Sequence, residues 1–238
     1  MRITKQIEQY QEGMQVAVQK LRAKVLDLAI HGKLVPQDPN DEPAIKLLQR
    51  INPSFVPCDT SHYENLPKSW CVATLGDVGK WQAGGTPKRG IKDFYGGDIP
   101  WLKTGDLNDS FVTSIPEYIT QAGIDNSSAK LNPQGSVLVA MYGATIGKIG
   151  ILTFPAATNQ ACCACIDYPA LEMMYLYYFL LSHRDAFIEQ GGGGAQPNIS
   201  KEIITKTQIP IPPIEEQKRI VYKISEIFSL IDEITAEL

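Results

Sequence analysis

The segments of this chain that could carry catalytic chemistry are short, rich in glycine, or contain histidine. Gly143-Ala144-Thr145-Ile146-Gly147-Lys148 is spaced like a phosphate-binding loop, but it has three residues between its glycines where four are required. Ile149 then stands where Ser or Thr should bind magnesium. The glycines at 191–194 lack the strand–turn–helix setting of a dinucleotide fingerprint, so they indicate a flexible loop. We expect no nucleotide site.

Other enzymatic patterns are also absent from the sequence. The chain has three histidines, which are His31, His62 and His183. None stands near a convincing nucleophile, and the Gly-x-Ser-x-Gly elbow is missing. Pro212-Pro213 lies between isoleucines, so it is not the Asn/Asp-Pro-Pro-aromatic stretch with which amino-methyltransferases hold a flipped base. The acidic residues are scattered without an obvious nuclease trio, and we therefore expect no catalytic residues.

The five cysteines do not indicate a disulfide framework or a metal site. They are Cys58, Cys71, Cys162, Cys163 and Cys165. The count is odd, and three of them fall within four positions of an apolar run. No second Cys pair or His stands at zinc-ligand spacing. We expect reduced cysteines in the core, because free Cys buries like a small hydrophobe.

Composition indicates a folded protein whose charge is unevenly distributed. Of the 238 residues, 44% are hydrophobic and 20% are charged, and no apolar run is long enough for a transmembrane helix. The N-terminus is polar, which leaves the cytoplasm as the expected compartment. The formal net charge is −4, which is unusual for a DNA-binding protein. However, residues 80–92 carry four basic residues and no acid, whereas residues 214–238 carry three basic and six acidic residues.

Apolar residues recur at helical spacing at both ends of the chain. The N-terminal series consists of Ile3, Ile7, Tyr10, Met14, Val18, Leu21, Val25 and Leu28. The C-terminal series consists of Ile220, Ile224, Ile227, Ile231, Ile234 and Leu238. Gly32 is the predicted end of the first helix, and Pro212-Pro213 precede the start of the last. Isolated helices of this length are marginal in water, so each series needs a partner, and the two helices are expected to pair.

Between these helices the sequence predicts a short helix, a linker and a mixed domain. Asp41 is the predicted N-cap of a helix over 44–51, with Pro43 in its first turn. The prolines and polar residues of 52–66 indicate a linker. From 67 to 213, runs rich in Val and Ile alternate with turn residues, and the clearest strand is 135–141, with 148–152 and 161–166 as its neighbours. A helix is expected at 170–190, with Met174, Tyr177, Tyr178 and Leu181 on its apolar face.

Several motifs, taken in order, resemble the Type I restriction–modification DNA specificity subunits. They are Leu66-Pro67-Lys68-Ser69-Trp70, Leu75-Gly76-Asp77-Val78, Gly84-Gly85-Thr86-Pro87, the segments 95–107 and 133–150, Asn159-Gln160-Ala161, Gln196-Pro197-Asn198-Ile199-Ser200 and the segment 211–220. Each motif alone is weak, but their joint order over about 150 residues is specific. Residues 21–51 are similar to the segment that precedes a recognition domain in these subunits.

The resemblance implies an α+β fold with one target-recognition domain between two partner-binding helices. We divide the chain into an N-terminal helical region at 1–51, a linker at 52–66, the recognition domain at 67–213 and a coiled-coil helix at 214–238. The terminal helices are expected to form an antiparallel coiled coil through Leu21, Val25, Leu28, Ile220, Ile224, Ile227, Ile231 and Ile234. Family members commonly carry two recognition domains, so one domain implies a half-subunit that dimerises, or a truncated or exchangeable cassette.

The resemblance also implies the function and the partners. The chain would bind double-stranded DNA and bring a methyltransferase subunit to a split target, and a motor–nuclease subunit could join the complex. The chain itself would hold no cofactor, because S-adenosylmethionine is expected on the methyltransferase. A homodimer through the terminal helices would favour a symmetric target. Two rival interpretations are a nuclease or methyltransferase fused to the recognition domain, and a coiled-coil scaffold without independent DNA binding.

Loops of the recognition domain are expected to enter the major groove, where each base pair presents its own pattern of donors and acceptors. The candidate DNA-binding residues are Lys88, Arg89, Lys92, Lys103, Thr104, Tyr142, Thr145, Lys148, Gln196 and Asn198. Lys88, Arg89 and Lys92 are expected near phosphate, and the amides of Gln196 and Asn198 suit adenine edges. For each position, an ordinary solvated loop residue is the competing interpretation. Trp70, Trp81 and Trp101 are expected in the core rather than stacked on bases.

Overall fold

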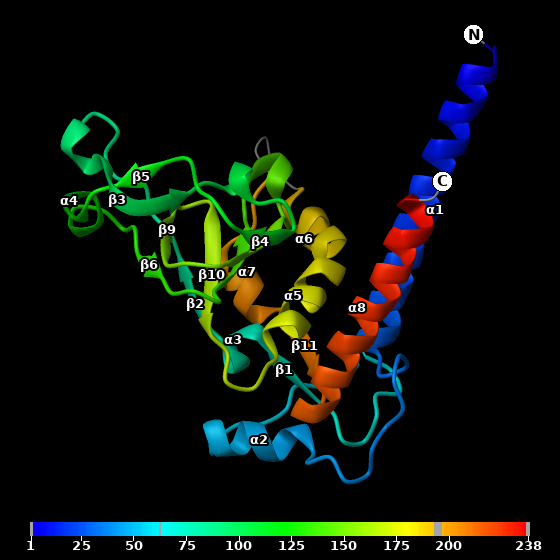
Figure 1. Ribbon diagram of the computed structural model, residues 1–238. Coiled ribbons are helices and arrows are strands. Elements are labelled where there is room, and N and C mark those ends of the chain that lie inside the picture. The colour runs from blue at the N-terminus through cyan, green and yellow to red at the C-terminus, as the bar shows by residue number, and fades with distance from the viewer. Residues whose placement is uncertain (1, 62, 193–196, 237–238) are drawn as a thin grey trace.

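A computed structural model describes residues 2–61, 63–192 and 197–236 of the chain, with side chains considered from Tyr10 onward. Figure 1 shows a domain of strands and short helices, with two long helices extending from one side of it. These helices are α1 (Arg2–Ile30) and α8 (Ile214–Ala236), which run in opposite directions and which we call the arm. The predicted mixed α/β class is confirmed. The side chains of Ile3, Ile7 and Leu238 lie outside the described residues.

Helix α1 ends at the glycine that the sequence indicates. Gly32 has a φ of 66°, which is the left-handed conformation that glycine adopts without a steric penalty. The N–H of Lys33 donates to Leu28 O at 2.9 Å, and the N–H of Gly32 donates to Ala29 O at 3.3 Å. These two hydrogen bonds form a Schellman motif, which satisfies the last carbonyl groups of the helix. The chain can therefore turn sharply back toward the domain.

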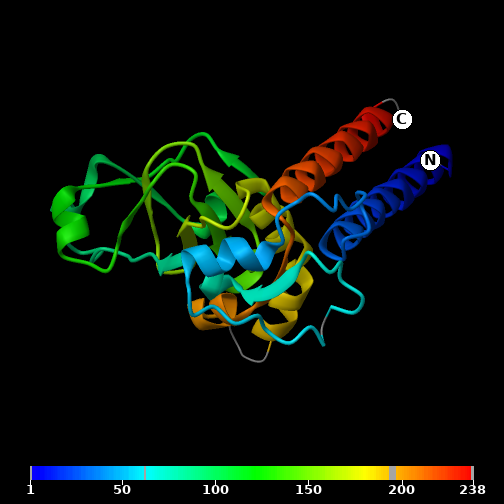
Figure 2. The ribbon, with the colours of Figure 1, turned by 90° about the horizontal axis from the view of Figure 1, so that it is seen from below.

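The lower half of the arm packs into the core of the domain. Val25 on α1 and both Ile220 and Ile224 on α8 belong to the same buried cluster as helix α5 (Met173–Ser182). The sequence predicted that the C-terminal apolar series packs on a partner helix along its whole length. In this half of the arm the prediction was incomplete, because α5 lies between the sheet and the arm and supplies a second apolar surface for the same series. Figure 2 shows the remainder of the two helices extending beyond the domain.

Five strands form the central sheet. In order across the sheet they are β2 (Lys80–Ala83), β10 (Cys162–Asp167), β7 (Val137–Ala140), β8 (Ile149–Leu152) and β4 (Ser110–Val112). All neighbours are antiparallel except β4, which runs parallel to β8. The predicted strand at 135–141 and its two predicted neighbours are confirmed. Because β7, β8 and the first four residues of β10 are buried on both faces, their sequences are continuously apolar.

The cysteine cluster follows the alternation of side chains along β10. Cys163 and Cys165 face the core shared with α5, whereas Cys162 faces the opposite core with Leu138. Burial raises the pKa of the Cys163 and Cys165 thiols to about 12. All five cysteines are free, and four of them are buried as predicted, whereas Cys58 is only half-buried.

Two smaller sheets complete the strand structure. One contains β5 (Tyr118–Ile119), β3 (Tyr95–Leu102), β9 (Ala156–Thr158) and β6 (Leu131–Asn132) in that order. The other is an antiparallel pair of β1 (Cys71–Thr74) and β11 (Gln208–Ile211), which joins the start of the domain to its end. The short helices are α3 (Leu75–Val78), α4 (Gln121–Asp125), α7 (Lys201–Lys206), η1 (Lys92–Phe94), η2 (Thr104–Asp106) and η3 (Gly143–Thr145).

The single helix predicted over 170–190 is in fact two helices. Helix α5 ends at Ser182, and α6 (Arg184–Gly191) begins beyond His183. The His183 ring packs on Phe179 with a centroid distance of 4.1 Å, and burial lowers the pKa of this histidine to about 4. His183 is therefore a half-buried residue at this break, and its surroundings favour the neutral ring. Four residues of α5 are almost fully buried, namely Tyr175, Leu176, Phe179 and Leu180, whereas the predicted face includes the half-buried Met174 and Leu181.

The segment before the domain departs from the prediction at Asp41. Helix α2 (Ala44–Ile51) has Pro43 at its N-cap position and no side-chain cap. Asp41 instead accepts a hydrogen bond from Arg219 of α8 at 2.5 Å. The sequence could not show this, because the partner lies 178 residues away. Residues 52–66 contain no helix or strand in the described part, yet Phe55 and Tyr63 are buried, so this segment is packed on the domain.

Candidate nucleic-acid interface

The loop between β2 and β3 is held rigidly at its base. Gly84 and Gly85 pack directly against the end of β9, and a Cβ on Gly84 would overlap with the backbone oxygens of Thr158 and Asn159. The N–H of Gly85 donates to Thr158 O at 2.9 Å, and the indole N–H of Trp101 donates to Gly85 O at 3.0 Å. The two glycines are therefore needed for close backbone contact. The exposed tip at 88–92 projects from a fixed base.

Arg89, at this tip, lies over two aromatic rings and beside an acid. Its guanidinium carbon is 5.6 Å from the centroid of the Tyr95 ring and 5.4 Å from that of Trp101. One guanidinium nitrogen is 3.8 Å from Oε2 of Glu117, and Lys103 pairs with Oε1 of the same carboxylate. Three side chains from separate loops thus form one charged cluster, which we call the Arg89 cluster.

The sequence prediction included Arg89 and Lys103 but missed Glu117. This glutamate lies between β4 and β5, in a stretch without any other charged residue from 110 to 124. This isolation was the one signal in the sequence that marked Glu117 as a candidate. It does not indicate which cations the carboxylate contacts. Lys88 and Lys92 are exposed on the same loop, and Thr104 is half-buried in η2 next to Lys103. The structure therefore brings Arg89 and Lys103 together through an acid that neither motif contains.

A second group of predicted residues surrounds the turn between β7 and β8. The N–H of Ile199 donates to Met141 O at 2.9 Å, and Tyr142 forms an isolated β-bridge with Asn198. The hydroxyl of Thr145 donates to Tyr142 O at 2.8 Å, and the Lys148 N–H donates to Thr145 O at 2.9 Å. Tyr142 is 44% exposed. The structure thus joins Tyr142, Thr145, Lys148 and Asn198, whereas Gln196 lies outside the described residues.

The P-loop-like spacing at 143–148 is a hairpin connection. Gly143 and Gly147 have φ angles of 64° and 75°, and the turn leads directly from β7 into the antiparallel strand β8. A phosphate-binding loop instead leads from a strand into a helix whose N-terminus faces the phosphate. The segment 143–148 therefore lacks the strand-to-helix setting of a phosphate-binding loop.

An ion pair between Arg184 and Asp109, which the sequence did not predict, supports this hairpin. Arg184 of α6 donates to Gly147 O at 3.0 Å and pairs with Asp109. Asp109 adopts a φ of 59°, its carboxylate accepts from the Ile149 N–H at 3.0 Å, and its carbonyl accepts from the Tyr177 hydroxyl at 2.6 Å. This contact fixes the loop after η2 against the hairpin. In Figure 1 the segments 88–94, 103–106 and 142–148 all lie along the upper edge of the domain.

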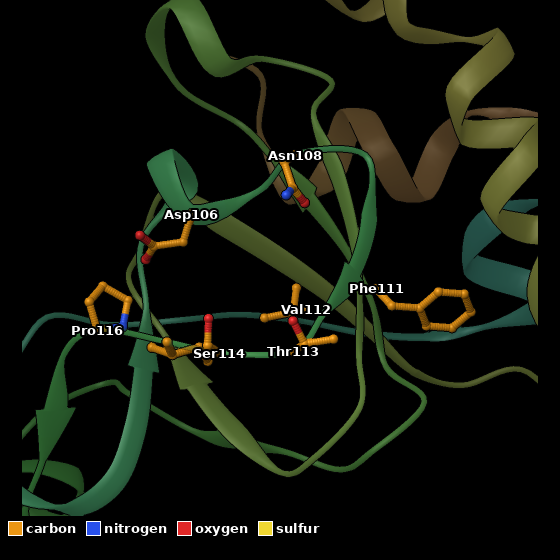
Figure 3. A pocket seen from close by; sticks show the side chains of 8 residues that line it. Asp106, Asn108, Phe111, Val112, Thr113, Ser114 and Pro116 are labelled. Atoms are coloured by element: carbon orange, nitrogen blue, oxygen red, sulfur yellow. The ribbon is translucent and has the colours of Figure 1, made fainter. Parts of the chain in front are cut away.

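A hollow of about 400 Å³ lies beside η2, below this edge. Figure 3 shows the side chains of Asp106, Asn108, Thr113 and Ser114 around it, while the Phe111 ring points away. The Asp106 carboxylate is already used, because it accepts from the Lys103 backbone N–H at 2.8 Å. No lysine or arginine lines the hollow, so it is a poor site for phosphate. We assign the candidate interface to the loops of the edge and not to this hollow.

A buried polar network joins the arm to the domain at the start of α8. Glu216 has no exposed surface, and its carboxylate accepts from the Trp70 indole N–H at 2.9 Å and from the Gln37 amide at 2.5 Å. Burial raises the pKa of Glu216, against the opposing effect of these two hydrogen bonds. The neighbouring Gln217 accepts from the Glu172 N–H at 2.8 Å and donates to the carbonyl oxygens of Ala170 and Pro212.

The three tryptophans lie in the core, whereas the predicted helix-partner residues differ in their burial. Trp70, Trp81 and Trp101 are all buried, which confirms the core prediction. Among the predicted helix-partner residues, Val25, Ile220, Ile224 and Ile231 are buried, and Leu28 and Ile227 are half-buried. Leu21 and Ile234 are 51% and 61% exposed, so they are largely uncovered in the single chain. No helix in the described ranges is long and apolar enough to cross a bilayer.

Comparison with known proteins gives a consistent result. Residues 67–238 match the family described as the Type I restriction modification DNA specificity domain. The chain is 31% identical over 171 residues to the EcoR124I/EcoR124II specificity subunit of Escherichia coli, a match that covers 69% of this chain and 42% of that protein. It is 30% identical over 172 residues to the MjaIX specificity subunit of Methanocaldococcus jannaschii, covering 70% and 40% respectively.

A solved structure shares the fold. The HsdS subunit from Thermoanaerobacter tengcongensis superposes with a TM-score of 0.61 and 21% identity, over 99% of this chain and 52% of that one. At this identity the likeness supports the fold alone. The matched regions cover 40–42% of the length of these two curated relatives.

Proposed function

Because the chain belongs to the Type I restriction modification DNA specificity family, we propose that it reads a DNA sequence and performs no chemistry of its own. The observation that carries the proposal is the gathering of the predicted loops on one edge of one domain. Arg89 and Lys103 meet in one cluster there, and Tyr142 and Asn198 meet in another. Each group combines an exposed polar surface with a loop stem that is fixed by buried contacts. Polar side chains held in this way can form hydrogen bonds with base edges in the major groove.

The partners follow from the same proposal. The curated relatives are named as specificity subunits of Type I restriction enzymes. We propose that this chain directs a methyltransferase subunit, which binds S-adenosylmethionine, to its DNA target, and that a motor–nuclease subunit can join them. The recognition domain at 67–213 carries 11 basic and 12 acidic residues, so it is nearly neutral. This charge is compatible with DNA binding, because a more basic partner can supply phosphate contacts. A protein that acts on chromosomal DNA in this way would work in the cytoplasm.

We further propose that the arm forms an antiparallel coiled coil and that two copies of the chain associate through it. Within one chain α1 and α8 are already antiparallel, and Arg22 pairs with Asp232 and lies 4.5 Å from the Phe228 ring centroid. Large apolar side chains nevertheless stay exposed on the arm, at Tyr10, Val16, Leu21, Leu230 and Ile234. A second copy could cover them and hold two recognition domains at a fixed separation.

The experiment is co-purification of the full chain with its methyltransferase partner, followed by methylation mapping. We expect a recurring two-part target with inverted copies of one half-site. An asymmetric target would contradict the homodimer but not DNA reading. Methylation without sequence preference would contradict DNA reading and favour the scaffold interpretation. Methyl transfer or strand cleavage by the purified chain alone would contradict the non-catalytic role.

A further inference from the structure

Arg89 differs from Lys88 and Lys92, the other cations at the tip of its loop, because its head group is held in place. Lys88 and Lys92 are exposed on the same loop. The Arg89 guanidinium, by contrast, lies over the Tyr95 and Trp101 rings and beside the Glu117 carboxylate. The side chain is still 61% exposed, so one edge of the guanidinium is free to meet a ligand.

The surface that holds Arg89 is itself fixed. Trp101 is fully buried, and its indole N–H is hydrogen-bonded to Gly85 O at 3.0 Å. The Tyr95 hydroxyl donates to Pro87 O at 2.6 Å. Lys103 pairs with the other oxygen of Glu117 and so helps to orient the carboxylate. Arg89 is therefore pre-organised, and less side-chain entropy is lost when it binds.

Glu117 decides which kind of ligand suits this arginine. A phosphate placed on the free edge of Arg89 would bring its negative charge close to the Glu117 carboxylate, and like charges repel. A guanine base presents two neutral acceptors, O6 and N7, which match the two-pronged guanidinium without this repulsion. Its partner cytosine presents an N4 amino donor, which tolerates a neighbouring carboxylate. Lys88 and Lys92, which flank Arg89, are the better phosphate contacts.

We propose that Arg89 reads a guanine in the major groove, with Glu117 and the two rings as its positioning groups. The proposal rests on the proposed function and deepens it, since it names the base that one residue recognises. Lys103 acts indirectly, by orienting Glu117.

The test uses the full chain in complex with its methyltransferase partner, on the target that methylation mapping identifies. Binding is measured to a set of duplexes in which each guanine is replaced in turn by another base or by 7-deazaguanine, which lacks the N7 acceptor. For the wild type we expect one guanine position in the half-site to be sensitive to both replacements. Arg89→Lys keeps the charge but loses the two-pronged geometry, so its preference for that guanine should fall about 5- to 150-fold. In this variant 7-deazaguanine at that position should have little further effect.

Two further variants separate base reading from other roles. Lys88→Gln is the matched control, and it should weaken binding to all sequences about equally and lower the salt dependence by about one unit of slope. Glu117→Gln should reduce the guanine preference while raising affinity for non-specific DNA, because the repulsion of phosphate is removed. A purely structural role for Glu117 would not raise non-specific affinity. Thermal unfolding of each variant shows whether it is folded.

The outcomes distinguish this inference from the proposed function. If Arg89→Lys keeps every base preference of the wild type, the inference is wrong while DNA reading stands. If it weakens all sequences equally, Arg89 is a phosphate contact and the inference is also wrong. If the wild-type complex shows no base preference at all, both the inference and the proposed function fail.

Discussion

Glu117 at the reading edge and Glu216 at the base of the arm are both glutamates that bind two partners, in opposite surroundings. Glu117 has a side chain that is 33% exposed, and its partners Arg89 and Lys103 are cations. Glu216 is fully buried, and its nearest partners are the neutral donors of Trp70 and Gln37. The Glu117 site keeps charged groups available to a ligand, whereas the Glu216 carboxylate binds only groups of the protein itself.

The difference shows how burial separates recognition from assembly in this molecule. A buried polar group that loses its partner costs far more than an exposed ion pair contributes, because water cannot replace the lost hydrogen bond. We therefore expect substitutions at the Glu216 network to change stability, and substitutions at the Arg89 cluster to change DNA preference.

Removing the Glu216 carboxylate should destabilise the protein most. In Glu216→Ala the buried indole N–H of Trp70 loses its acceptor, which costs about 1–3 kcal/mol, and the hydrogen bond from the exposed Gln37 amide is also lost, which costs about 1 kcal/mol. We expect the free energy of unfolding to fall by about 4 kcal/mol, measured by urea denaturation. Glu215→Ala is the matched control, because Glu215 is an exposed neighbour that pairs with Lys218, and it should cost less than about 1 kcal/mol. Equal losses in the two variants would contradict the role assigned to Glu216.

Gly84→Ala tests whether the base of the reading loop is as tightly packed as the arm junction. The new Cβ would overlap with the backbone oxygens of Thr158 and Asn159, and such overpacking costs about 3 kcal/mol. Gly90→Ala, at the tip of the same loop, meets nothing within 4 Å and should be tolerated. Urea denaturation of both variants measures the contrast. A stable Gly84→Ala protein would show that the base of the loop can move.

The pH dependence of stability should distinguish the Glu216 network. Burial raises the pKa of Glu216 above 4.5. A group with a raised folded pKa contributes stability below its unfolded pKa, and this contribution is lost as pH rises through the folded value. The wild type should therefore lose stability relative to Glu216→Gln over the pH range that begins at about 4.5, the ordinary pKa of a glutamate, and extends upward. Denaturation of both proteins across this range, with Glu215→Gln as the control, measures the difference. A constant difference would show that burial does not govern this carboxyl.

Glu117→Gln should have the smallest effect on stability. Exposed ion pairs contribute little, so we expect a change of less than about 1 kcal/mol, which should shrink further at high salt. Urea denaturation at two salt concentrations is the measurement. A loss comparable to that of Glu216→Ala would mean that the Arg89 cluster is structural, and the contrast between the two glutamates would disappear.

The sequence predicted the elements whose patterns are local. The three- and four-residue spacing from Ile220 indicated α8, Gly32 marked the end of α1, and the apolar run at 135–141 indicated β7. It failed where a distant partner decided the outcome. Asp41 is a normal N-cap residue in a local pattern, but Arg219 of α8 binds it. The apolar sequence of 170–190 contains no proline and no glycine before Gly191, so nothing in it marks the break at His183.

The loops that carry suitable groups could be predicted from the sequence, because their glycines, lysines and amides can be read directly. Which of these groups meet depends on the folded chain. Arg89, Lys103 and Glu117 come from three loops, and their contact depends on the packing of β3 beside β5 and β9. Electrostatic interactions depend on separation in space and on burial, and neither is encoded in the spacing of residues along a chain.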